Sequence, residues 1–429
     1  HLANEIITKE KVAWAIKSFS PFKSPGPDGI IPKMLQETLD CILPWLEEIF
    51  KACLNLGHIP DSWKLVKVVF IPKVGRRGHE SAKDFRPISL SSFLLKTFER
   101  LLDMPLRSSL ESSGISTAQH AYLKGKSTET ALHEVIRTIE GSLESKHYTM
   151  AAFLDIEGAF NNVSTDAIQR ALIDLEVDNC ISNWVISMLE TRIIKANMGN
   201  INITKKVHGG TPQGGVLSPL LWLCVISKIL IKLDGGGVKV VAYADDVVLM
   251  ASGLCPNTIS GIIQRALGEL NSWATGCGLS LNPRKTELML FTTRYKVPTF
   301  TLPNINGQTL ALSTSAKYLG VILDSKLSWK LNVEERVRKA EIALYACKRM
   351  LGRRWGLQPK HTLWLYKTVI RPILSYGSVV WWKALGREYN TKLLGRIQRS
   401  ACAITVGAIR SCPREALNAL THVIPIDLH

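Results

Sequence analysis

Residues 238–253 read VKVVAYADDVVLMASG and place two adjacent aspartates, Asp245 and Asp246, between two apolar runs. Both runs are rich in Val, which favours strands, so the stretch predicts an antiparallel hairpin with the aspartates at its tip. Asp is also a common residue of plain polar turns. Two like charges this close repel each other, and carboxylate oxygens are ligands that Mg²⁺ prefers. The stretch therefore predicts a metal site on a stiff hairpin, with a polar turn as the alternative.

A second carboxylate stands at the end of another apolar stretch, AAFLDIEGAFNNV, at residues 151–163. The run predicts a buried strand, and Asp155 lies where that strand turns toward a helix. Strand ends direct side chains into clefts, so Asp155 could converge with Asp245. Two divalent cations held by such carboxylates clamp the attacking and leaving oxygens of a phosphoryl transfer. The alternative is that Asp155 only caps the following turn.

Residues 209–222, GGTPQGGVLSPLLW, form a glycine-rich loop around Gln213. Glycines allow the backbone to approach a planar ligand closely, and Gln213 offers hydrogen bonds to a sugar or a base. Ser218 and Pro219 then suit the N-cap and first position of a helix. No GK[ST] follows, so the spacing differs from that of a phosphate-binding loop. A plain turn is the alternative.

The positive charge of the chain is concentrated near its C-terminus. The 429 residues carry a formal net charge of +17. Residues 326–429 hold 19 basic and 6 acidic residues, or +13, whereas the first 325 residues hold 34 and 30, or +4. A basic C-terminal third predicts a surface for a polyanion such as nucleic acid, with a solvated basic face as the alternative.

The pattern of strands and helices predicts an α+β body followed by helices alone. Expected strands lie at residues 64–71, 150–156 and 239–251, and expected helices follow Thr8 and cover residues 165–175. Helical spacing of apolar residues then runs from about Trp329 through Val333, Val337, Ala340, Leu344, Cys347 and Leu351. The last region is therefore predicted as a basic helical domain.

Cysteine use and hydropathy favour a reduced, intracellular protein without a membrane span. The nine cysteines include no CxxC pair, and Cys402, Cys412 and His422 are spaced too widely for a zinc knuckle. The most apolar run, residues 216–231, is interrupted by Pro219 and Lys228, which predicts a core helix. The chain begins with His rather than Met. We therefore expect a fragment of a longer polyprotein.

Several motifs, in this order, resemble the successive blocks of a reverse transcriptase. They are FRPISL (85–90), FLDIEGAF (153–160), TPQGGVLSPLLW (211–222), YADD (243–246), GLSLNPRKTELMLF (278–291) and KYLGVILD (317–324). KSPGPDGIIPKML (23–35) and FLLKTFERLL (93–102) are similar to the form found in non-LTR retrotransposons. RPILSYGSVVWW (371–382) and the segment 397–420 most resemble the insect R1 and Jockey-like elements.

The resemblance implies an α+β right-hand polymerase with fingers, a palm built on an antiparallel sheet, and a helical thumb. Residues 1–54 would form an N-terminal helical extension of the fingers, and residues 55–325 the fingers and palm. Residues 326–429 would form the basic helical thumb and a truncated downstream region. Such a thumb would hold a duplex by its phosphates.

The resemblance also implies a role for individual residues. Asp155, Asp245 and Asp246 would bind two Mg²⁺ ions, which Mn²⁺ could replace, and Lys285 would protonate the departing pyrophosphate. The nucleotide would contact Lys73 and Arg86 through its triphosphate, Phe160 through its sugar, and Gln213 and Gly214 near its base pair. Tyr318, Leu319 and Gly320 would grip the primer end. The alternatives are surface charges for Lys73, Arg86 and Lys285, and core packing for Phe160.

One departure from the family stands at Asn161, where a further Asp is common. That position is not a metal ligand in the family, so we expect altered folding or activity rather than loss. The expected partners are an RNA template, a DNA primer or target DNA, and deoxynucleoside triphosphates, with target-primed reverse transcription as the reaction. The expected location is the nucleus and cytoplasm, as a ribonucleoprotein, and the endonuclease would lie in a missing part of the polyprotein.

Three alternatives remain open, of which one is also an enzyme and two come from other classes. A polymerase fold kept as an inactive nucleic-acid scaffold should lose its carboxylates first, yet all three stand here. A group II intron maturase would share the palm but not SYGSVVWW (375–382). A simple basic RNA-binding protein would bind RNA whether or not Asp245 is present, and would synthesise nothing.

Overall fold

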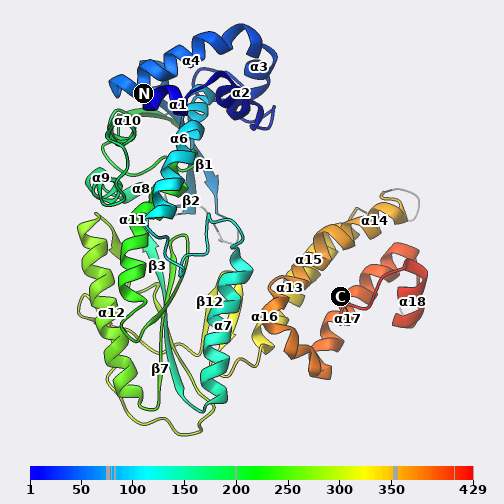
Figure 1. Cartoon of the computed structure of the whole chain (residues 1–429). Helices are drawn as coiled ribbons and strands as arrows, with labels where there is room; N and C mark the ends of the chain where they lie inside the picture. The colour runs from blue at the N-terminus through cyan, green and yellow to red at the C-terminus, as the bar shows by residue number, and fades with distance from the viewer. Residues whose placement is uncertain are drawn as a thin grey trace.

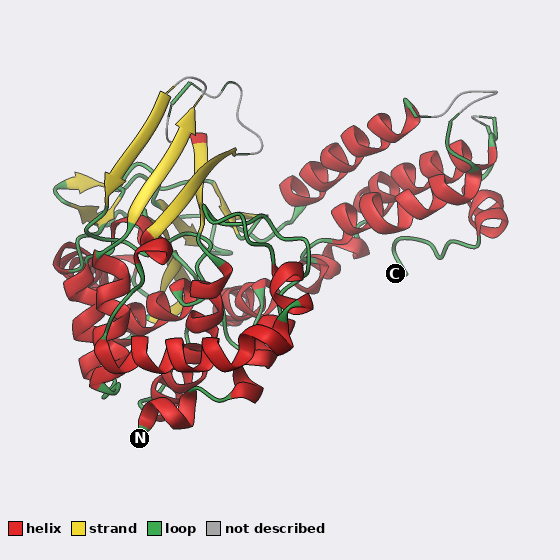
Figure 2. Ribbon diagram, turned by 90° about the horizontal axis from the view of Figure 1, so that it is seen from above, coloured by secondary structure: helices red, strands yellow, loops and turns green. Residues whose placement is uncertain are grey.

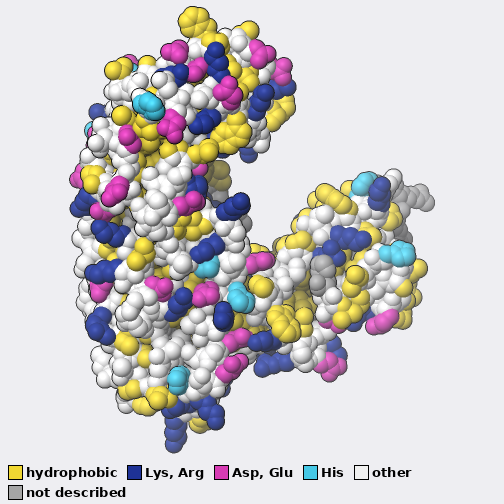
Figure 3. Space-filling view, in the orientation of Figure 1, with side chains coloured by type: hydrophobic (Ala, Val, Ile, Leu, Met, Phe, Trp, Pro, Cys, Tyr) yellow, Lys and Arg dark blue, Asp and Glu magenta, His cyan; other side chains and the backbone are white. Residues whose placement is uncertain are grey.

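The computed structural model describes residues 1–73, 78, 80–81, 84–198, 201–350, 356–409 and 411–428. Leu351, the last position of the predicted helical pattern, lies outside these residues. Figure 1 shows a long body with the N-terminus at one end and an arm of C-terminal helices projecting from its side. Figure 3 shows an open cleft between this body and the C-terminal arm.

Helices form the N-terminal end of the body (Figure 1): α1 (Leu2–Ile6), α2 (Lys9–Lys17), α3 (Pro32–Glu37), α4 (Leu39–Leu56) and α5 (Asp61–Lys64). The helix expected after Thr8 is confirmed, because the Thr8 side chain accepts a hydrogen bond from the amide of Lys11. Val12 and Ile16 of α2 are fully buried in the core. The expected domain boundary at residue 54 stays a prediction, and α4 continues to Leu56.

A first sheet follows, with strand order β2-β1-β4-β5. Its strands are β1 (Leu65–Pro72), β2 (Phe85–Leu90), β4 (Ile193–Met198) and β5 (Ile201–Lys206). The strand expected at residues 64–71 is thus confirmed as β1, which pairs antiparallel with β2 and parallel with β4. Helix α6 (Phe93–Ser112) follows β2, and Ser92 is its N-cap. The Ser92 side chain accepts a hydrogen bond from the amide of Leu94.

The central sheet is antiparallel throughout and is built around β3 (Tyr148–Glu157). Its other strands are β6 (Lys239–Tyr243), β7 (Asp246–Gly253), β8 (Ser280–Leu281) and β9 (Glu287–Phe291). β3 lies between β7 on one side and β9 and β8 on the other, and β6 forms a hairpin with β7. The strands expected at residues 150–156 and 239–251 are therefore confirmed, as is the antiparallel sheet expected for a palm.

Helices cover both faces of the central sheet. They are α7 (Thr128–Glu144), α8 (Ala159–Asn162), α9 (Thr165–Asp174), α10 (Asn179–Glu190), α11 (Ser218–Leu233) and α12 (Pro256–Gly276). Because side chains alternate along a strand, Met150, Ala152 and Leu154 pack in the core with α11 and α12, whereas Ala151 and Phe153 pack with α7. In Figure 2 the strands gather on one side of the body and most helices on the other.

Helix α11 corrects one detail of the expected structure. Its N-cap is Leu217 and not Ser218, which is the first helical residue. The Ser218 hydroxyl instead donates a hydrogen bond to the Pro212 carbonyl at 2.7 Å, because the glycine-rich loop folds back over the start of the helix. The helix is buried along most of its length, as expected for a core helix. Among the described residues, no helix combines the length and apolar character that crossing a membrane requires.

Two short hairpins lead from the palm sheet to the C-terminal arm: β10 (Asn304–Ile305) with β11 (Gln308–Thr309), and β12 (Ser315–Tyr318) with β13 (Val321–Asp324). The arm consists of α13 (Lys330–Lys348), α14 (Pro359–Leu365), η2 (Tyr366–Ile370), α15 (Arg371–Ser375), α16 (Ser378–Trp381), η3 (Trp382–Gly386), α17 (Glu388–Val406) and α18 (Arg414–Thr421). The helical C-terminal region is thus confirmed, while its boundary at residue 325 stays a prediction.

The arm is joined to the body by a shared apolar core. Phe153 of β3 and Tyr318 of β12 lie in the same buried cluster as Val333, Leu374 and Trp381 of the arm. Since β3 also carries Asp155, the base of the arm is packed against the strand that bears a predicted metal ligand.

Candidate active site

The three predicted metal ligands come together at the end of the β6–β7 hairpin. Asp155 of β3 lies directly opposite Asp246 of β7 in the strand register. Asp245 occupies the tight turn before β7, and its carbonyl accepts a hydrogen bond from the amide of Ile156 at 3.3 Å. The convergence expected from the two sequence segments is therefore present: strand pairing, which is fixed by buried apolar residues, sets the carboxylates side by side.

Two buried side chains hold the turn of the hairpin. Ala244 has φ = 56°, in the left-handed region that is costly for a residue with a Cβ, so this backbone must be stabilised by its surroundings. The Gln119 side-chain oxygen accepts a hydrogen bond from the Ala244 amide at 3.1 Å. The Trp222 indole donates one to the Ala244 carbonyl at 2.9 Å. Both polar groups of Ala244 are thus bound by side chains from elsewhere in the chain.

Lys285 lies between two carboxylates. Its ammonium is 2.9 Å from Asp155 and 2.9 Å from Glu157. Burial lowers the Lys285 pKa, but hydrogen bonds and charge attraction from Glu157 and Asp155 outweigh burial and leave the pKa raised. The side chain therefore carries its proton at neutral pH, as a proton donor must before it acts.

The surroundings of Asp245 and Asp246 disfavour the charged form of both carboxyl groups. Burial raises the pKa of Asp245, and repulsion from Asp155 adds to this, while the charges of Arg86 and Lys285 lower it. Burial and repulsion from Asp245 and Asp155 raise the pKa of Asp246 to about 7. Crowded, partly buried carboxylates of this kind are stabilised by a bound cation, so the donor set fits a divalent metal ion.

Several of the predicted site residues line one hollow of about 410 Å³. They are Asp155, Asp246, Lys285, Tyr318 and Leu319. Within the described part of the chain, no group of three or more His, Cys, Asp or Glu side chains already forms a cage for a metal ion. The ammonium of Lys285 lies against Asp155 instead, so metal binding at this carboxylate would compete with an internal ion pair.

The glycine-rich loop connects the predicted nucleotide residues. The Gln213 carbonyl accepts a hydrogen bond from the amide of Ser89 in β2 at 2.8 Å. Gly214 has φ = 118°, and a Cβ there would lie 2.8 Å from the Ser89 carbonyl oxygen, so glycine is required for backbone packing at this position. At the other end of the loop, the Thr211 amide donates to the carbonyl of Phe160. The loop therefore joins β2 to α8.

Phe160 is hydrogen-bonded to this loop, whereas Arg86 lies on β2 and Lys73 follows the end of β1. The Phe160 ring is half-buried, with ring centroids 6.4 Å from Tyr122 and 6.1 Å from Trp222. Arg86 is exposed on β2 and lowers the Asp245 pKa through its charge. Lys73 follows the end of β1, where its amide donates to the Asp84 carbonyl at 2.8 Å. Nucleotide contacts of all three residues stay predictions.

The predicted primer-grip residues form the turn of the β12–β13 hairpin. Leu319 and Gly320 both have positive φ, 44° and 83°, as a two-residue hairpin turn requires. The Tyr376 hydroxyl donates to the Leu319 carbonyl at 2.8 Å, and Arg336 donates to the Gly320 carbonyl. Both donors come from the arm, so the arm directly holds the turn beside the carboxylates.

Sequence patterns did not reveal the side chains that support the site. Gln119 and Arg336 lie outside the motifs, whereas Glu157, Trp222 and Tyr376 lie within them without an assigned role, and each of the five binds a partner in another element. Gln119 and Ala244, for example, are 125 residues apart. These supporting residues could have been predicted only from the burial of polar side chains near the motifs, and burial cannot be determined from the sequence.

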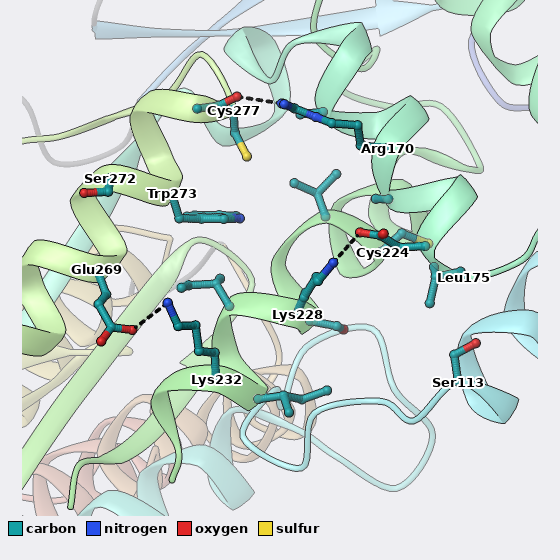
Figure 4. Close-up of a pocket in the computed structure, with 18 of the residues that line it drawn as sticks. Ser113, Arg170, Leu175, Cys224, Lys228, Lys232, Glu269, Ser272, Trp273 and Cys277 are labelled. Atoms are coloured by element: carbon teal, nitrogen blue, oxygen red, sulfur yellow. Dashed lines mark hydrogen bonds and ion pairs between the residues drawn. The ribbon is translucent and has the colours of Figure 1, made fainter. Parts of the chain in front are cut away.

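A larger hollow of about 1,010 Å³ lies elsewhere, between α9, α11 and α12 (Figure 4). Its two carboxylates are paired with lysines, Asp174 with Lys228 at 2.8 Å and Glu269 with Lys232 at 3.2 Å. None of the predicted site residues lines it. Size alone therefore does not mark a reaction site, and the smaller hollow stays the candidate because Asp155 and Asp246, which line it, lie opposite each other in the strand register.

Comparison with known proteins gives one consistent result. Residues 71–323 match the family described as reverse transcriptase (RNA-dependent DNA polymerase). The chain is 30% identical over 397 residues to a probable RNA-directed DNA polymerase from transposon BS of Drosophila melanogaster, covering 90% of this chain and 43% of that protein. It is 27% identical over 420 residues to a Pol polyprotein from type-1 retrotransposable element R1 of Bradysia coprophila, covering 98% and 41%.

A third relative, the RNA-directed DNA polymerase from mobile element jockey of Drosophila funebris, is 27% identical over 395 residues, with 90% and 42% covered. The chain thus spans only about two fifths of these relatives, 41–43% of their length. Among solved structures, apo telomerase from Candida tropicalis aligns with a TM-score of 0.46 at 13% identity, covering 86% of this chain and 68% of that one.

Proposed function

Because this chain belongs to the reverse transcriptase (RNA-dependent DNA polymerase) family, we propose that it extends a primer 3′-hydroxyl with deoxynucleotides copied from an RNA template. The observation that carries the proposal is the strand register that sets Asp155 opposite Asp246, with Asp245 in the adjoining turn. The similarity to insect retrotransposon polymerases favours the non-LTR retrotransposon reading over a group II intron maturase. The presence of all three carboxylates favours an enzyme over an inactive scaffold.

Asp155, Asp245 and Asp246 would hold the divalent cations, Mg²⁺ or Mn²⁺. When bound, the ions supply charge stabilisation to the attacking and leaving oxygens of the phosphoryl transfer. The unfavourable electrostatics of Asp245 and Asp246 support this assignment, because a cation would offset the burial and the repulsion that raise both pKa values. A ligand role for each aspartate is part of the proposal.

The basic side chains of the site would act on the phosphates of the nucleotide. Lys285 would give a proton to the pyrophosphate as it departs, and its protonated state beside Asp155 supports this role. Arg86 lies where its charge acts on Asp245, which suits a contact to the triphosphate. Lys73, at the neighbouring end of β1, would share that contact.

Residues around the glycine-rich loop would select the nucleotide. Phe160 would lie under the sugar and exclude a 2′-hydroxyl by steric contact. Gln213 and Gly214 would contact the incoming nucleotide and its template partner, and the hydrogen bond between Gln213 and Ser89 supports a fixed loop position. Correct positioning of reactants is a large part of catalysis in this chemistry, so a rigid loop matters.

The primer and its duplex would lie between the body and the arm. Tyr318, Leu319 and Gly320 would grip the primer end, and the cleft in Figure 3 supports a place for the duplex. The net charge of +13 on residues 326–429 would bind duplex phosphates without regard to sequence. We further propose target-primed synthesis on DNA as the use of this activity, within a ribonucleoprotein found in the nucleus and cytoplasm.

A primer-extension assay on a primed RNA template tests the proposal. With the four deoxynucleoside triphosphates and Mg²⁺, the chain should synthesise DNA, and a chelator should stop synthesis until excess Mg²⁺ or Mn²⁺ is added. Omitting the template separates polymerisation from untemplated addition. Tight duplex binding with no extension under any of these conditions would contradict the proposal and favour the scaffold alternative.

A further inference from the structure

One acidic and one basic side chain lie buried beneath residues 209–217, the part of the glycine-rich segment that precedes α11. Glu99 of α6 is 1% exposed, and Arg192, between α10 and β4, is 6% exposed. Burial of charge is costly unless each group is bound by partners. Neither residue contacts the carboxylate hollow, so the proposed reaction does not account for them.

Glu99 holds the C-terminal end of the loop. One of its carboxylate oxygens accepts a hydrogen bond from the Val216 amide at 3.1 Å, and the other has no hydrogen-bond partner among the described residues. Burial raises the Glu99 pKa, while the amides of Val216 and Leu217 and the charge of Arg192 lower it. A Cβ on Gly215 would lie 3.2 Å from the unpartnered oxygen, so the loop backbone is closely packed against this carboxylate.

Arg192 holds the N-terminal end of the same loop. Its guanidinium donates to the Gly209 carbonyl at 2.8 Å and also to the Gly210 carbonyl, and its Nε donates to the Leu189 carbonyl at 3.1 Å. Burial lowers the Arg192 pKa to about 10, which still leaves the group charged at neutral pH, and the charge of Glu99 opposes this lowering. The loop is therefore held near both ends by two buried side chains, Glu99 and Arg192.

Between these ends the loop touches both predicted nucleotide elements. Gln213 is bound to Ser89 of β2, and Thr211 to Phe160 of α8. Gly210 has φ = 68°, and a Cβ there would lie 2.2 Å from the Asn161 carbonyl oxygen, so a shift of the loop would be transmitted to α8. A displacement at either end would thus move Gln213 relative to Phe160.

We propose that Glu99 and Arg192 are positioning residues that fix the loop 209–217 and thereby set the affinity and selectivity for the incoming deoxynucleotide. They act through Gln213 and Phe160 and do not touch the nucleotide themselves. The inference rests on the proposed polymerase function. It assigns to the pair a role in nucleotide binding, distinct from duplex binding and from the chemistry at the carboxylates.

Glu99→Gln tests the inference with little change in shape. The variant keeps one acceptor for the Val216 amide but removes the carboxylate that interacts with the charges of Lys96 and Arg192. We expect the KM for deoxynucleotide to rise about tenfold, with kcat changed less than twofold and duplex affinity unchanged. Discrimination against ribonucleotides should fall in parallel. Glu111→Gln, at an exposed position near the end of α6, is the matched control and should change none of these values.

If a melting curve shows that Glu99→Gln does not fold, a second variant tests the same inference. Arg192→Lys keeps the charge but cannot present the same fork of donors to two carbonyls, so a smaller rise in the same KM is expected. Folded variants with the parent KM and the parent selectivity would overturn the inference.

Binding of an α,β-imido deoxynucleotide to the chain on a primed template separates this inference from the proposed function. This analogue should bind about tenfold more weakly to Glu99→Gln than to the parent, even without turnover. A parent that synthesises DNA while the variants bind the analogue equally well overturns the inference alone. A parent that neither synthesises DNA nor binds the analogue contradicts the proposed function and this inference together.

Discussion

Replacing Gln119 by Leu should disable the hairpin turn without touching a carboxylate. The Gln119 side chain is fully buried, and its oxygen accepts hydrogen bonds from the amides of Ala244 at 3.1 Å, His120 at 3.0 Å and Ala121 at 2.9 Å. Leu has a similar volume but no acceptor, so three buried amides would lose this bond at once. The His120 amide also donates to the Ala242 carbonyl and so stays satisfied.

The magnitude follows from the two remaining amides. A buried donor left without a partner costs about 1–3 kcal/mol, so the loss at Ala244 and Ala121 should destabilise the fold by about 2–6 kcal/mol. Because Ala244 is held at positive φ, part of this loss should appear as movement of the turn and of Asp245. We therefore expect kcat for primer extension to fall at least about tenfold at temperatures where the variant is folded.

The assay combines a urea unfolding curve with steady-state primer extension. Gln169→Leu, which replaces an exposed glutamine on α9, is the control and should leave both stability and kcat unchanged. A Gln119→Leu protein with the urea midpoint and the kcat of the parent would refute the claim that this side chain holds the turn.

Three further predictions address the arm, the fold at low pH and the sugar. Tyr376→Phe removes the hydrogen bond to Leu319, worth about 0.5–1.5 kcal/mol, and should shorten the DNA made per binding event. Tyr345→Phe, on the exposed side of α13, is the control and should leave the product length unchanged. Equal product lengths for the two variants would contradict the claim that the arm holds the primer-grip turn. Burial lowers the pKa of His120 to about 4 in the folded chain, against about 6.5 when unfolded, so stability should be lost between pH 6.5 and 4, by up to about 3 kcal/mol. His120→Gln should flatten this decline in melting temperature, and an unchanged decline would assign it to other groups. Phe160→Ala should raise ribonucleotide incorporation at least about tenfold, measured as a ratio of kcat/KM values, and unchanged selectivity would remove its role at the sugar.

The central sheet could be predicted because its information is local. Val-rich apolar runs on both sides of a tight turn predict a hairpin, and the end of a buried run places Asp155 at a strand end. The structure confirms both strands and their antiparallel pairing. The start of α11 was misplaced by one residue, because Ser218 donates its hydroxyl to the folded-back loop and so cannot cap the helix.

The supporting side chains could not be predicted, because their partners are distant in the chain. Glu99 binds an amide 117 residues away, and Lys285 an aspartate 130 residues away. Such contacts depend on how helices pack on the sheet and leave no periodic signal. Lys285 was expected from the family resemblance as a proton donor, but its ion pair with Glu157 was not expected from any pattern.

The central claim is that the carboxylates of the hairpin and of β3 act together in a metal-dependent reaction. The most direct test compares primer extension by Asp245→Asn and by the parent over a range of Mg²⁺ concentrations. Asp174→Asn, in the larger hollow, is the matched control. We predict that Asp245→Asn binds the primed template as tightly as the parent and the control but extends it at least about a thousandfold more slowly at every Mg²⁺ concentration. Extension at the parent rate, with the parent dependence on Mg²⁺, would contradict the central claim.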